Sequence, residues 1–217
     1  VHGSWKSHAL MLGMDKNTPV KDQFFELNRR WDAYPVEPVT VERAEAPCKE
    51  NTITENIDLF RVLSPYRIND QDGGFFLSKA AVITGDPEYP EDMNKLNVGT
   101  YRIQIKDKDR VGIQALPFHD IAIQLEKAEK ANQPLPIAIA LGNAPLVTFM
   151  ASTPIAYDQS EYAFAGALQD GKPVRIVRAD TCSYLYVPAE SEVILEGYII
   201  PRLRKVEGPV GEFPGSY

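Results

Sequence analysis

Three side chains in the middle of the chain have the chemistry of ligands for a hard divalent cation. Asn97, His119 and Glu161 offer an amide oxygen, an imidazole and a carboxylate. Mg²⁺ and Mn²⁺ prefer oxygen and nitrogen donors of this kind to thiolates. Because the three residues are far apart in sequence, spacing alone favours separate structural roles, and a shared metal site is the alternative.

Two carboxylates near the C-terminal end could move protons. Glu207 and Glu212 are separated by Gly-Pro-Val-Gly, a turn-forming sequence that bends the backbone. If the two acids share a cleft with a cation, one stays ionised and the other can have a pKa suited to proton transfer. Arg102 is a candidate for that cation, although an isolated arginine in a strand more often forms a surface or structural ion pair.

Small polar residues between two expected helices could bind a phosphate. Ser152, Thr153 and Pro154 come shortly before Ser160 and Glu161, and hydroxyl and backbone groups of this kind form phosphate cradles. The sequence contains no Walker motif, no GxGxxG and no GxSxG. Ordinary nucleotide-binding motifs and a nucleophile elbow are therefore excluded.

Composition excludes several classes of partner. The chain has 30 acidic and 23 basic residues, a net charge of -7 and no basic run, so we expect no nucleic acid. No apolar stretch approaches the length of a membrane span, so we expect no membrane partner. Cys48 and Cys182 lie far apart and outside any CxxC motif, which argues against a zinc knuckle or a disulfide-stapled fold and favours a reduced, cytoplasmic location. Lys127 and Lys130 are expected on a solvated helix face.

Residues 1–56 are expected to be the remainder of an N-terminal α/β region followed by a linker. Ser4 can cap a short helix, and Thr18 followed by Pro19 predicts the N-cap and first turn of a second helix that reaches Trp31. Prolines between residues 35 and 47 indicate an extended connector with an edge strand. Residues 57–217 then form the main unit.

Residues 57–217 contain the elements that must position the candidate side chains. Alternation over residues 97–105 predicts one half-buried strand that carries Asn97 and Arg102 and forms a hairpin with residues 111–114. His119 precedes an amphipathic helix at residues 120–132. Further elements are expected as strands at residues 79–84, 135–141, 173–178, 183–187 and 193–200, and helices at residues 146–150 and 160–168. Mixed strands with segregated helices predict an α+β domain with an antiparallel sheet or barrel.

Five motifs, in this order, resemble those of the UbiD-type decarboxylases. They are residues 97–102 (NVGTYR), 119–120 (HD), 160–167 (SEYAFAGA), 195–197 (LEG) and 207–213 (EGPVGEF). Residues 3–27 also resemble the hydroxyarylic (phenolic) acid decarboxylase branch of that family. Val210 stands where many relatives have phenylalanine, and it is still apolar.

The resemblance implies a split β-barrel flavin-binding domain of antiparallel or mixed sheet with flanking helices, in residues 57–217. It implies prenylated FMN as the cofactor, together with Mn²⁺ or Mg²⁺ and with K⁺ at the phosphate. Asn97, His119 and Glu161 match the metal ligands of the family, and Arg102, Glu207 and Glu212 match its catalytic set. The implied cofactor contacts are Val98, Gly99, Thr100, Tyr101, Arg102, Phe118, His119, Ala151, Ser152, Thr153, Pro154 and Glu161. The C-terminal domain of the family is expected to lie outside this sequence.

The implied reaction is the reversible, non-oxidative decarboxylation of a small aromatic acid of the 4-hydroxybenzoate type, such as 4-hydroxybenzoate or vanillate. Arg102 would keep Glu207 ionised, and Glu212 would protonate the ring carbon after carbon dioxide leaves. A flavin prenyltransferase would supply the cofactor, and the complete protein would be a homo-oligomer, either a dimer or a hexamer. Two alternatives stay open: a non-catalytic flavin-binding fragment or module, and a flavin reductase on a similar barrel.

Overall fold

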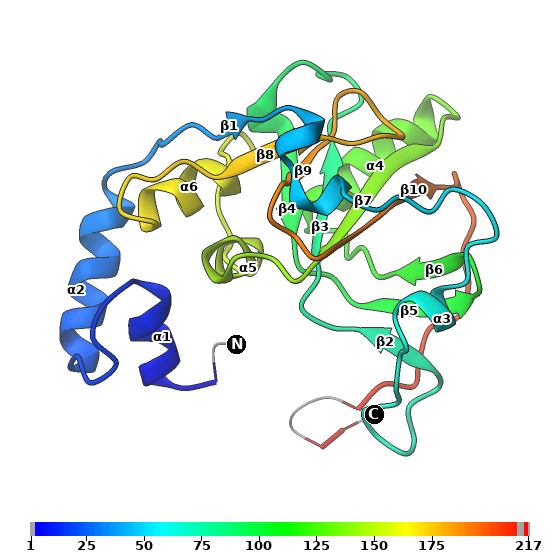
Figure 1. Cartoon of the computed structure of the whole chain (residues 1–217). Helices are drawn as coiled ribbons and strands as arrows, with labels where there is room; N and C mark the ends of the chain where they lie inside the picture. Colours follow the sequence, from blue (N-terminus) through cyan, green and yellow to red (C-terminus); the bar gives the residue numbers. More distant parts are fainter. Residues whose placement is uncertain (1–2, 212–214, 217) are drawn as a thin grey trace.

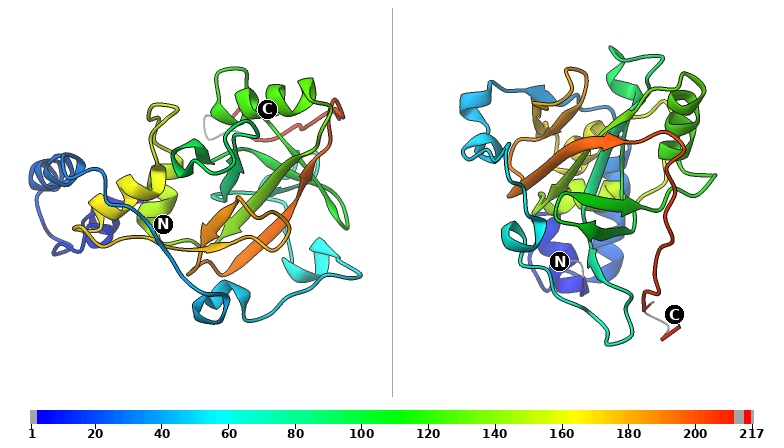
Figure 2. Two further views of the ribbon diagram at one scale, coloured as in Figure 1. Left: turned by 90° about the horizontal axis from the view of Figure 1, so that it is seen from above. Right: turned by 90° about the vertical axis from the view of Figure 1, so that its right-hand side faces the viewer.

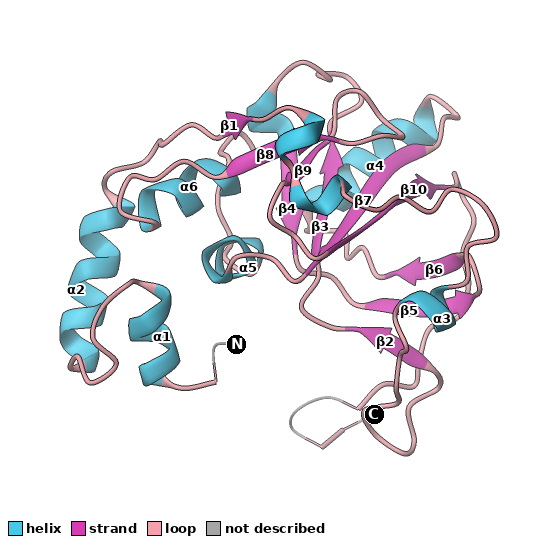
Figure 3. Cartoon of the chain, in the orientation of Figure 1, coloured by secondary structure: helices cyan, strands magenta, loops and turns pink. Residues whose placement is uncertain are grey.

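The fold is centred on a four-stranded antiparallel sheet with a smaller sheet and helices packed around it. The computed structural model describes residues 3–211 and 215–216. The described strands form three open sheets with the orders β10-β7-β3-β4, β2-β5-β6 and β1-β8-β9 (Figure 1). Figure 3 shows the helices α1 and α2 gathered at one side of the molecule and most strands at the other. The predicted α+β class, with antiparallel sheets and flanking helices, is confirmed.

The central sheet is built on a strand that is buried on both faces. That strand is β7 (Leu135–Leu141), as the continuous apolar run predicts, and it pairs antiparallel with β3 (Ala81–Gly85) and β10 (Val193–Ile199). The other edge of the sheet is β4 (Leu96–Gly99), which pairs with β3. Side chains from the whole of β3 are buried, so the sheet has a packed layer on each side.

Alternate residues of β3 separate those two layers. Ile83 packs in a cluster with α5 (Pro145–Ala151) and α6 (Glu161–Leu168). Val82 packs in another cluster with strand β5 (Ile103–Asp107) and helix α4 (Asp120–Lys130). Alternate side chains of β3 therefore point to opposite faces of the sheet, and each face is buried against different elements. Figure 2 gives two further views of these layers.

The second sheet contains β2 (Phe75–Leu77), β5 (Ile103–Asp107) and β6 (Arg110–Ile113). The expected hairpin of β5 and β6 is confirmed, but the prediction of one continuous strand over residues 97–105 is wrong. The chain leaves the central sheet after β4 because the Thr100 amide donates to the Ala151 carbonyl (2.7 Å) instead of to a neighbouring strand. Residues 100–102 thus join two sheets, and Arg102 lies in this crossing rather than within the hairpin.

The third sheet joins the N-terminal connector to the rest of the chain by strand pairing. β1 (Val39–Thr40) pairs in parallel with β8 (Arg175–Arg178), and β8 pairs antiparallel with β9 (Tyr186–Pro188). The connector therefore contains an edge strand, as predicted. It continues through two 3-10 turns, Arg43–Glu45 and Pro47–Lys49. A domain boundary after residue 56 stays a prediction.

The first two helices are α1 (Trp5–Met11) and α2 (Val20–Trp31). Ser4 caps α1 as predicted, because its side chain accepts a hydrogen bond from the Ser7 amide. The expected cap at Thr18 is wrong: the helix begins after Pro19, and the Thr18 hydroxyl donates instead to the Asp15 carbonyl (2.7 Å).

The described residues contain two further α-helices and one further 3-10 turn. Helix α4 (Asp120–Lys130) begins as predicted and ends two residues early. Every residue of α6 is buried. The shorter segments are α3 (Leu59–Val62) and a 3-10 turn (Met93–Lys95).

Candidate active site

A buried carboxylate at the start of α6 has one oxygen without a partner. Glu161 is 7% exposed, and its Oε2 atom accepts no hydrogen bond from any described residue. Burial raises the pKa of Glu161 to about 8, and a hydrogen bond from the Val98 backbone partly offsets that effect. A buried, unpartnered carboxylate oxygen is the kind of group that a cation would satisfy.

Asn97, on β4, presents its amide oxygen in the same region. Its Nδ2 atom donates to Thr84 Oγ1 (3.0 Å), so the hydrogen-bond pattern places Oδ1 on the side of Tyr101, whose hydroxyl donates to it (3.0 Å). The Tyr101 ring also packs edge-on against the His119 ring, with 5.2 Å between centroids. Tyr101 thereby brings Asn97 and His119 into one cluster.

His119 occupies the N-cap position of α4, with an extended backbone. Its Nδ1 atom accepts a hydrogen bond from the Leu116 amide (3.3 Å), so a neutral ring in this arrangement carries its proton on Nε2. Within the described part of the chain, no group of three His, Cys, Asp or Glu side chains could hold a metal. A metal site here would therefore need a ligand of another kind, such as the Asn97 amide, and the set of Asn97, His119 and Glu161 stays a prediction.

Arg102 and Glu207 form a bidentate ion pair across 105 positions of sequence. Arg102 Nε contacts Glu207 Oε1 at 2.7 Å, and Arg102 Nη2 contacts Oε2 at 2.7 Å. Both side chains are partly exposed, at 31% and 21%. This geometry fixes the plane of the carboxylate. Glu212, the third member of the expected catalytic set, lies outside the described residues.

The candidate phosphate-binding residues lie beside the crossing between the two sheets. Ser152 is exposed and its hydroxyl is 3.0 Å from that of Thr100, while the Thr153 hydroxyl donates to the Phe149 carbonyl. Gly99 has a steric role, because a Cβ atom there would lie 2.4 Å from the Tyr101 hydroxyl. The ring of Phe118, which is 77% exposed, packs against His119 with 4.6 Å between centroids. Proximity thus groups residues 97–102, 118–119 and 151–153.

Several residues that support this region carry no recognisable motif. Asp86 is buried and accepts hydrogen bonds from Lys127 Nζ and the Tyr157 hydroxyl, each at 2.6 Å. The expectation of a solvated Lys127 is therefore wrong, whereas Lys130 is exposed as predicted. The sequence also does not predict that Thr84 contacts Asn97, because a threonine in an apolar strand gives no signal of its hydrogen-bond partner.

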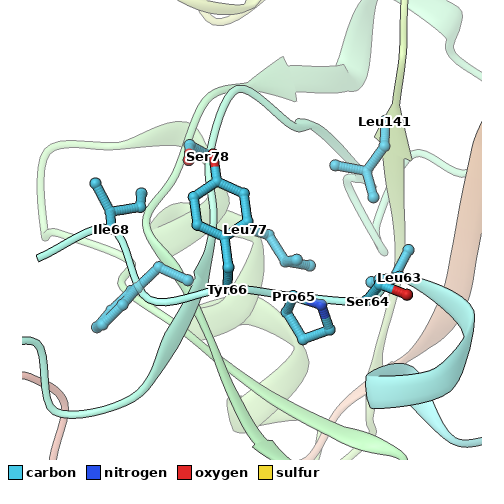
Figure 4. A pocket seen from close by; sticks show the side chains of 9 residues that line it. Leu63, Ser64, Pro65, Tyr66, Ile68, Leu77, Ser78 and Leu141 are labelled. Atoms are coloured by element: carbon cyan, nitrogen blue, oxygen red, sulfur yellow. The ribbon is translucent and has the colours of Figure 1, made fainter.

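A pocket of about 250 Å³ lies away from these residues. It lies between the segment that follows α3 and the end of β2, and Tyr66 is one of its lining side chains (Figure 4). Its lining is mostly apolar and includes none of the residues predicted for the site: Leu63, Ser64, Pro65, Tyr66, Ile68, Phe76, Leu77, Ser78 and Leu141. This depression therefore gives no support to the chemistry proposed below.

Comparison with known proteins decides the family. A model described as "3-octaprenyl-4-hydroxybenzoate carboxy-lyase Rift-related domain" matches residues 39–217. The chain belongs to the UbiD family. The phenolic acid decarboxylase of Sedimentibacter hydroxybenzoicus is 71% identical over 217 residues, which are 100% of this chain and 45% of that protein. The phenolic acid decarboxylase of Bacillus subtilis is 55% identical over the same shares. The UbiD resemblance read from the motifs is confirmed.

Solved structures of this family superpose closely on the chain. Vanillic acid decarboxylase of Sedimentibacter hydroxybenzoicus in its closed form gives a TM-score of 0.98 at 71% identity, covering 100% of this chain and 46% of that one. The UbiD-class enzyme HmfF from Pelotomaculum thermopropionicum, an evolved dimeric form in complex with prFMN, gives 0.87 at 33% identity, over 99% and 48%. This UbiD chain spans about half the length of these relatives. None of its described helices is long and apolar enough to cross a membrane.

Proposed function

We propose that this chain is part of a prenylated-FMN-dependent decarboxylase that acts reversibly on phenolic acids of the 4-hydroxybenzoate type, such as 4-hydroxybenzoate or vanillate. The observation that carries the proposal is the bidentate pair of Arg102 and Glu207, next in sequence to the cluster around Tyr101. The relatives described as phenolic acid and vanillic acid decarboxylases support the substrate class. The complex of HmfF with prFMN supports the cofactor.

The donor set fits a divalent cation of the Mn²⁺ or Mg²⁺ type. Asn97 would contribute Oδ1, His119 an imidazole nitrogen, and Glu161 the carboxylate whose Oε2 accepts no hydrogen bond from the described residues. An amide oxygen, an imidazole and a carboxylate suit such an ion and would also recruit a dianionic phosphate. The exposed Ser152 hydroxyl and backbone groups of residues 151–154 would hold that phosphate together with K⁺.

The chain's own residues would then orient the substrate and move one proton. Prenylated FMN supplies, when bound, the electron sink that decarboxylation of an aromatic ring requires. Arg102 holds the Glu207 carboxylate in a fixed plane through two hydrogen bonds, and Glu212 would be the carboxyl group that donates a proton to the vacated ring carbon. In the reverse direction Glu212 would remove that proton.

Glu212→Gln in the complete, cofactor-loaded protein tests the proposal. A glutamine cannot donate the carboxylic proton, so turnover measured as release of carbon dioxide should fall by at least ~100-fold. The flavin content, measured from the visible absorption spectrum, should equal that of the wild type. Glu126→Gln is the matched control, because Glu126 is an exposed residue on α4. Full activity of the Glu212 variant would contradict the proposal.

The proposal extends to partners and to the competing functions. We propose a flavin prenyltransferase as the source of the cofactor and a dimer or hexamer as the assembled form of the complete protein. A non-catalytic flavin-binding module would bind the same cofactor and release no carbon dioxide. A flavin reductase would instead bind plain FMN and oxidise a nicotinamide. Assays of carbon dioxide release and of nicotinamide oxidation therefore separate all three functions.

A further inference from the structure

The segment that carries Glu207 has no regular structure of its own. Residues 203–211 follow β10 and lie in no helix or strand. In Figure 1 this segment (red) runs past the sheet of β2, β5 and β6 toward the turn that precedes β2. Because no ladder holds its backbone, the position of Glu207 depends on contacts with other elements.

Strand β5 supplies two of those contacts. Lys106 Nζ donates to the Val206 carbonyl (2.6 Å), and Gln104 Oε1 accepts a hydrogen bond from the Gly208 amide (3.3 Å). These two bonds bracket Glu207 on both sides along the chain. Arg102, just before the same strand, donates hydrogen bonds to the Glu207 carboxylate itself.

The turn at residues 69–74 supplies the remaining contacts through a buried carboxylate. Asp72 is 4% exposed, and its Oδ1 atom accepts the Gly211 amide (2.7 Å) while its Oδ2 atom accepts the Asn69 amide (2.9 Å). The amide of the next residue, Gly73, donates to the Pro209 carbonyl (2.7 Å). The backbone hydrogen bonds from Gly211 and Asn69 also lower the pKa of Asp72 below its ordinary value. The carboxylate and the Gly73 amide thus join the turn to the segment at two backbone positions.

The approach of the two backbones leaves no room for a side chain at position 73. A Cβ atom on Gly73 would lie 2.2 Å from the Gly208 carbonyl oxygen and 2.6 Å from its carbon. Backbone atoms cannot rotate away as the end of a flexible side chain can, so the segment itself would have to move. Asp72 and Gly73 therefore form a close-fitting surface against which residues 206–211 pack.

We propose that Asp72 is a positioning residue that holds residues 206–211 so that Glu207 meets Arg102 in its bidentate geometry. This inference rests on the proposed function for its catalytic meaning. Asp72 acts at Gly211, which is four residues after Glu207 and directly before Glu212 in sequence. A shift of about 1 Å in a group that must be aligned for reaction can reduce turnover by about 100-fold, so the two hydrogen bonds of this carboxylate act on the rate without touching substrate.

The test compares Asp72→Asn with Asp70→Asn in the complete protein loaded with cofactor. An asparagine side chain can accept one of the two backbone hydrogen bonds and not both, whereas Asp70 is exposed in the same turn. Hydrogen–deuterium exchange of peptides covering residues 203–211 should be at least about tenfold faster in the Asp72 variant and unchanged in the Asp70 variant. In the Asp72 variant kcat should fall by about tenfold or more, with KM and flavin content unchanged.

A second pair of variants tests the contact between Gly73 and residues 206–211. Gly73→Ala should reproduce the faster exchange and the lower kcat, while Gly197→Ala, whose Cβ atom would meet nothing within 4 Å, should change neither. Wild-type exchange in both the Asp72 and Gly73 variants would overturn the proposal, and so would faster exchange with an unchanged kcat. If the loaded wild type decarboxylates no phenolic acid, the proposed function fails, and the exchange rates still decide whether Asp72 holds the segment.

Discussion

The side-chain amide of Asn97 has its orientation set by two hydrogen bonds. Thr84 Oγ1 accepts from the nitrogen, and the oxygen is thereby directed toward Tyr101 and the neighbouring His119. In metal sites, a partner that orients a ligand contributes to affinity although it does not touch the ion. Thr84, which is fully buried, has this position relative to Asn97.

Thr84→Val is therefore expected to weaken binding at the proposed metal site. Valine has nearly the same shape but accepts no hydrogen bond, so the Asn97 amide loses its fixed orientation, and affinity for Mn²⁺ should fall by ~10–100-fold. Titration of the complete protein with Mn²⁺ measures this change. Thr148→Val, a buried threonine on α5, is the matched control and should bind the metal as the wild type does.

At this scale the sequence predicts residue types better than their partners. The chemistry of Asn97, His119 and Glu161 suggests a hard cation, but spacing gives no reason to group them. The structure brings Asn97 and His119 together through Tyr101, whose hydroxyl and ring reach two different segments. A partner of this kind is fixed by tertiary packing, which the local sequence does not record.

Helix α2 is attached to the rest of the molecule by charged and aromatic contacts with α6. Arg30 donates to the Leu168 carbonyl (2.8 Å) and to Glu26, and Trp31 packs against Phe164 with 4.3 Å between ring centroids. Hydrogen bonds from Arg29 and Arg30 lower the pKa of Glu26 to about 2. Glu26 is thus ionised in the folded state well below its ordinary pKa.

Glu26→Gln should destabilise the protein in a manner that depends on pH. Because the folded state lowers the pKa of Glu26, the ion pair stabilises the fold fully above about pH 4.5, and this contribution is lost as the pH falls toward 2. Partial exposure limits the effect to about 1 kcal/mol. Thermal unfolding should give a lower Tm for the variant at pH 7 and a smaller difference at pH 4. An equal difference at both values would contradict this assignment.

The loop between α5 and α6 is anchored at Tyr157. Its hydroxyl donates to Asp86, which is buried and which Lys127 of α4 also contacts. Tyr157→Phe leaves Asp86 with one partner fewer and should lower the free energy of unfolding by about 1–2 kcal/mol. Urea unfolding measures the change, and Tyr89→Phe, at an exposed tyrosine, should have no measurable effect.

Elements could be predicted from the sequence where a single pattern filled a whole segment. The strand expected at residues 135–141 and the helix expected at residues 160–168 agree within one residue with the observed bounds of β7 and α6. The single strand predicted over residues 97–105 failed because its alternation continues across residues 100–102, where the chain changes sheets. That change depends on the Ala151 carbonyl, which lies in another helix.

For the whole molecule, one lysine joins the N-terminal connector to the central sheet. Lys49 Nζ contacts Glu196 of β10 (2.8 Å) and Asp180 (3.1 Å), although the lysine side chain is only 4% exposed. Thr181 donates to the same Glu196 through its amide and its hydroxyl. A nearly buried network of this kind holds segments that are distant in sequence.

Lys49→Ala should therefore be more harmful than loss of a surface lysine. Removing one partner from a buried ion pair costs about 3–5 kcal/mol, and we expect about 3 kcal/mol because Glu196 keeps its bonds to Thr181. Lys130→Ala, which removes an exposed pair on α4, should change the free energy of unfolding by less than ~0.5 kcal/mol. Chemical denaturation of the complete protein distinguishes the two. Equal effects would contradict the role of Lys49.

The crossing at residues 100–102 also sets a length scale for whatever binds here. Asn97 lies in β4 of one sheet and Arg102 comes just before β5 of another, so about five residues of chain separate the proposed metal ligand from the ion pair. A chain spans at most ~3.6 Å per residue, so their Cα atoms can be no more than about 18 Å apart. The length of the crossing therefore limits the distance between Asn97 and Arg102. Inserting or deleting one residue within it would alter the spacing available to a ligand that contacts both residues.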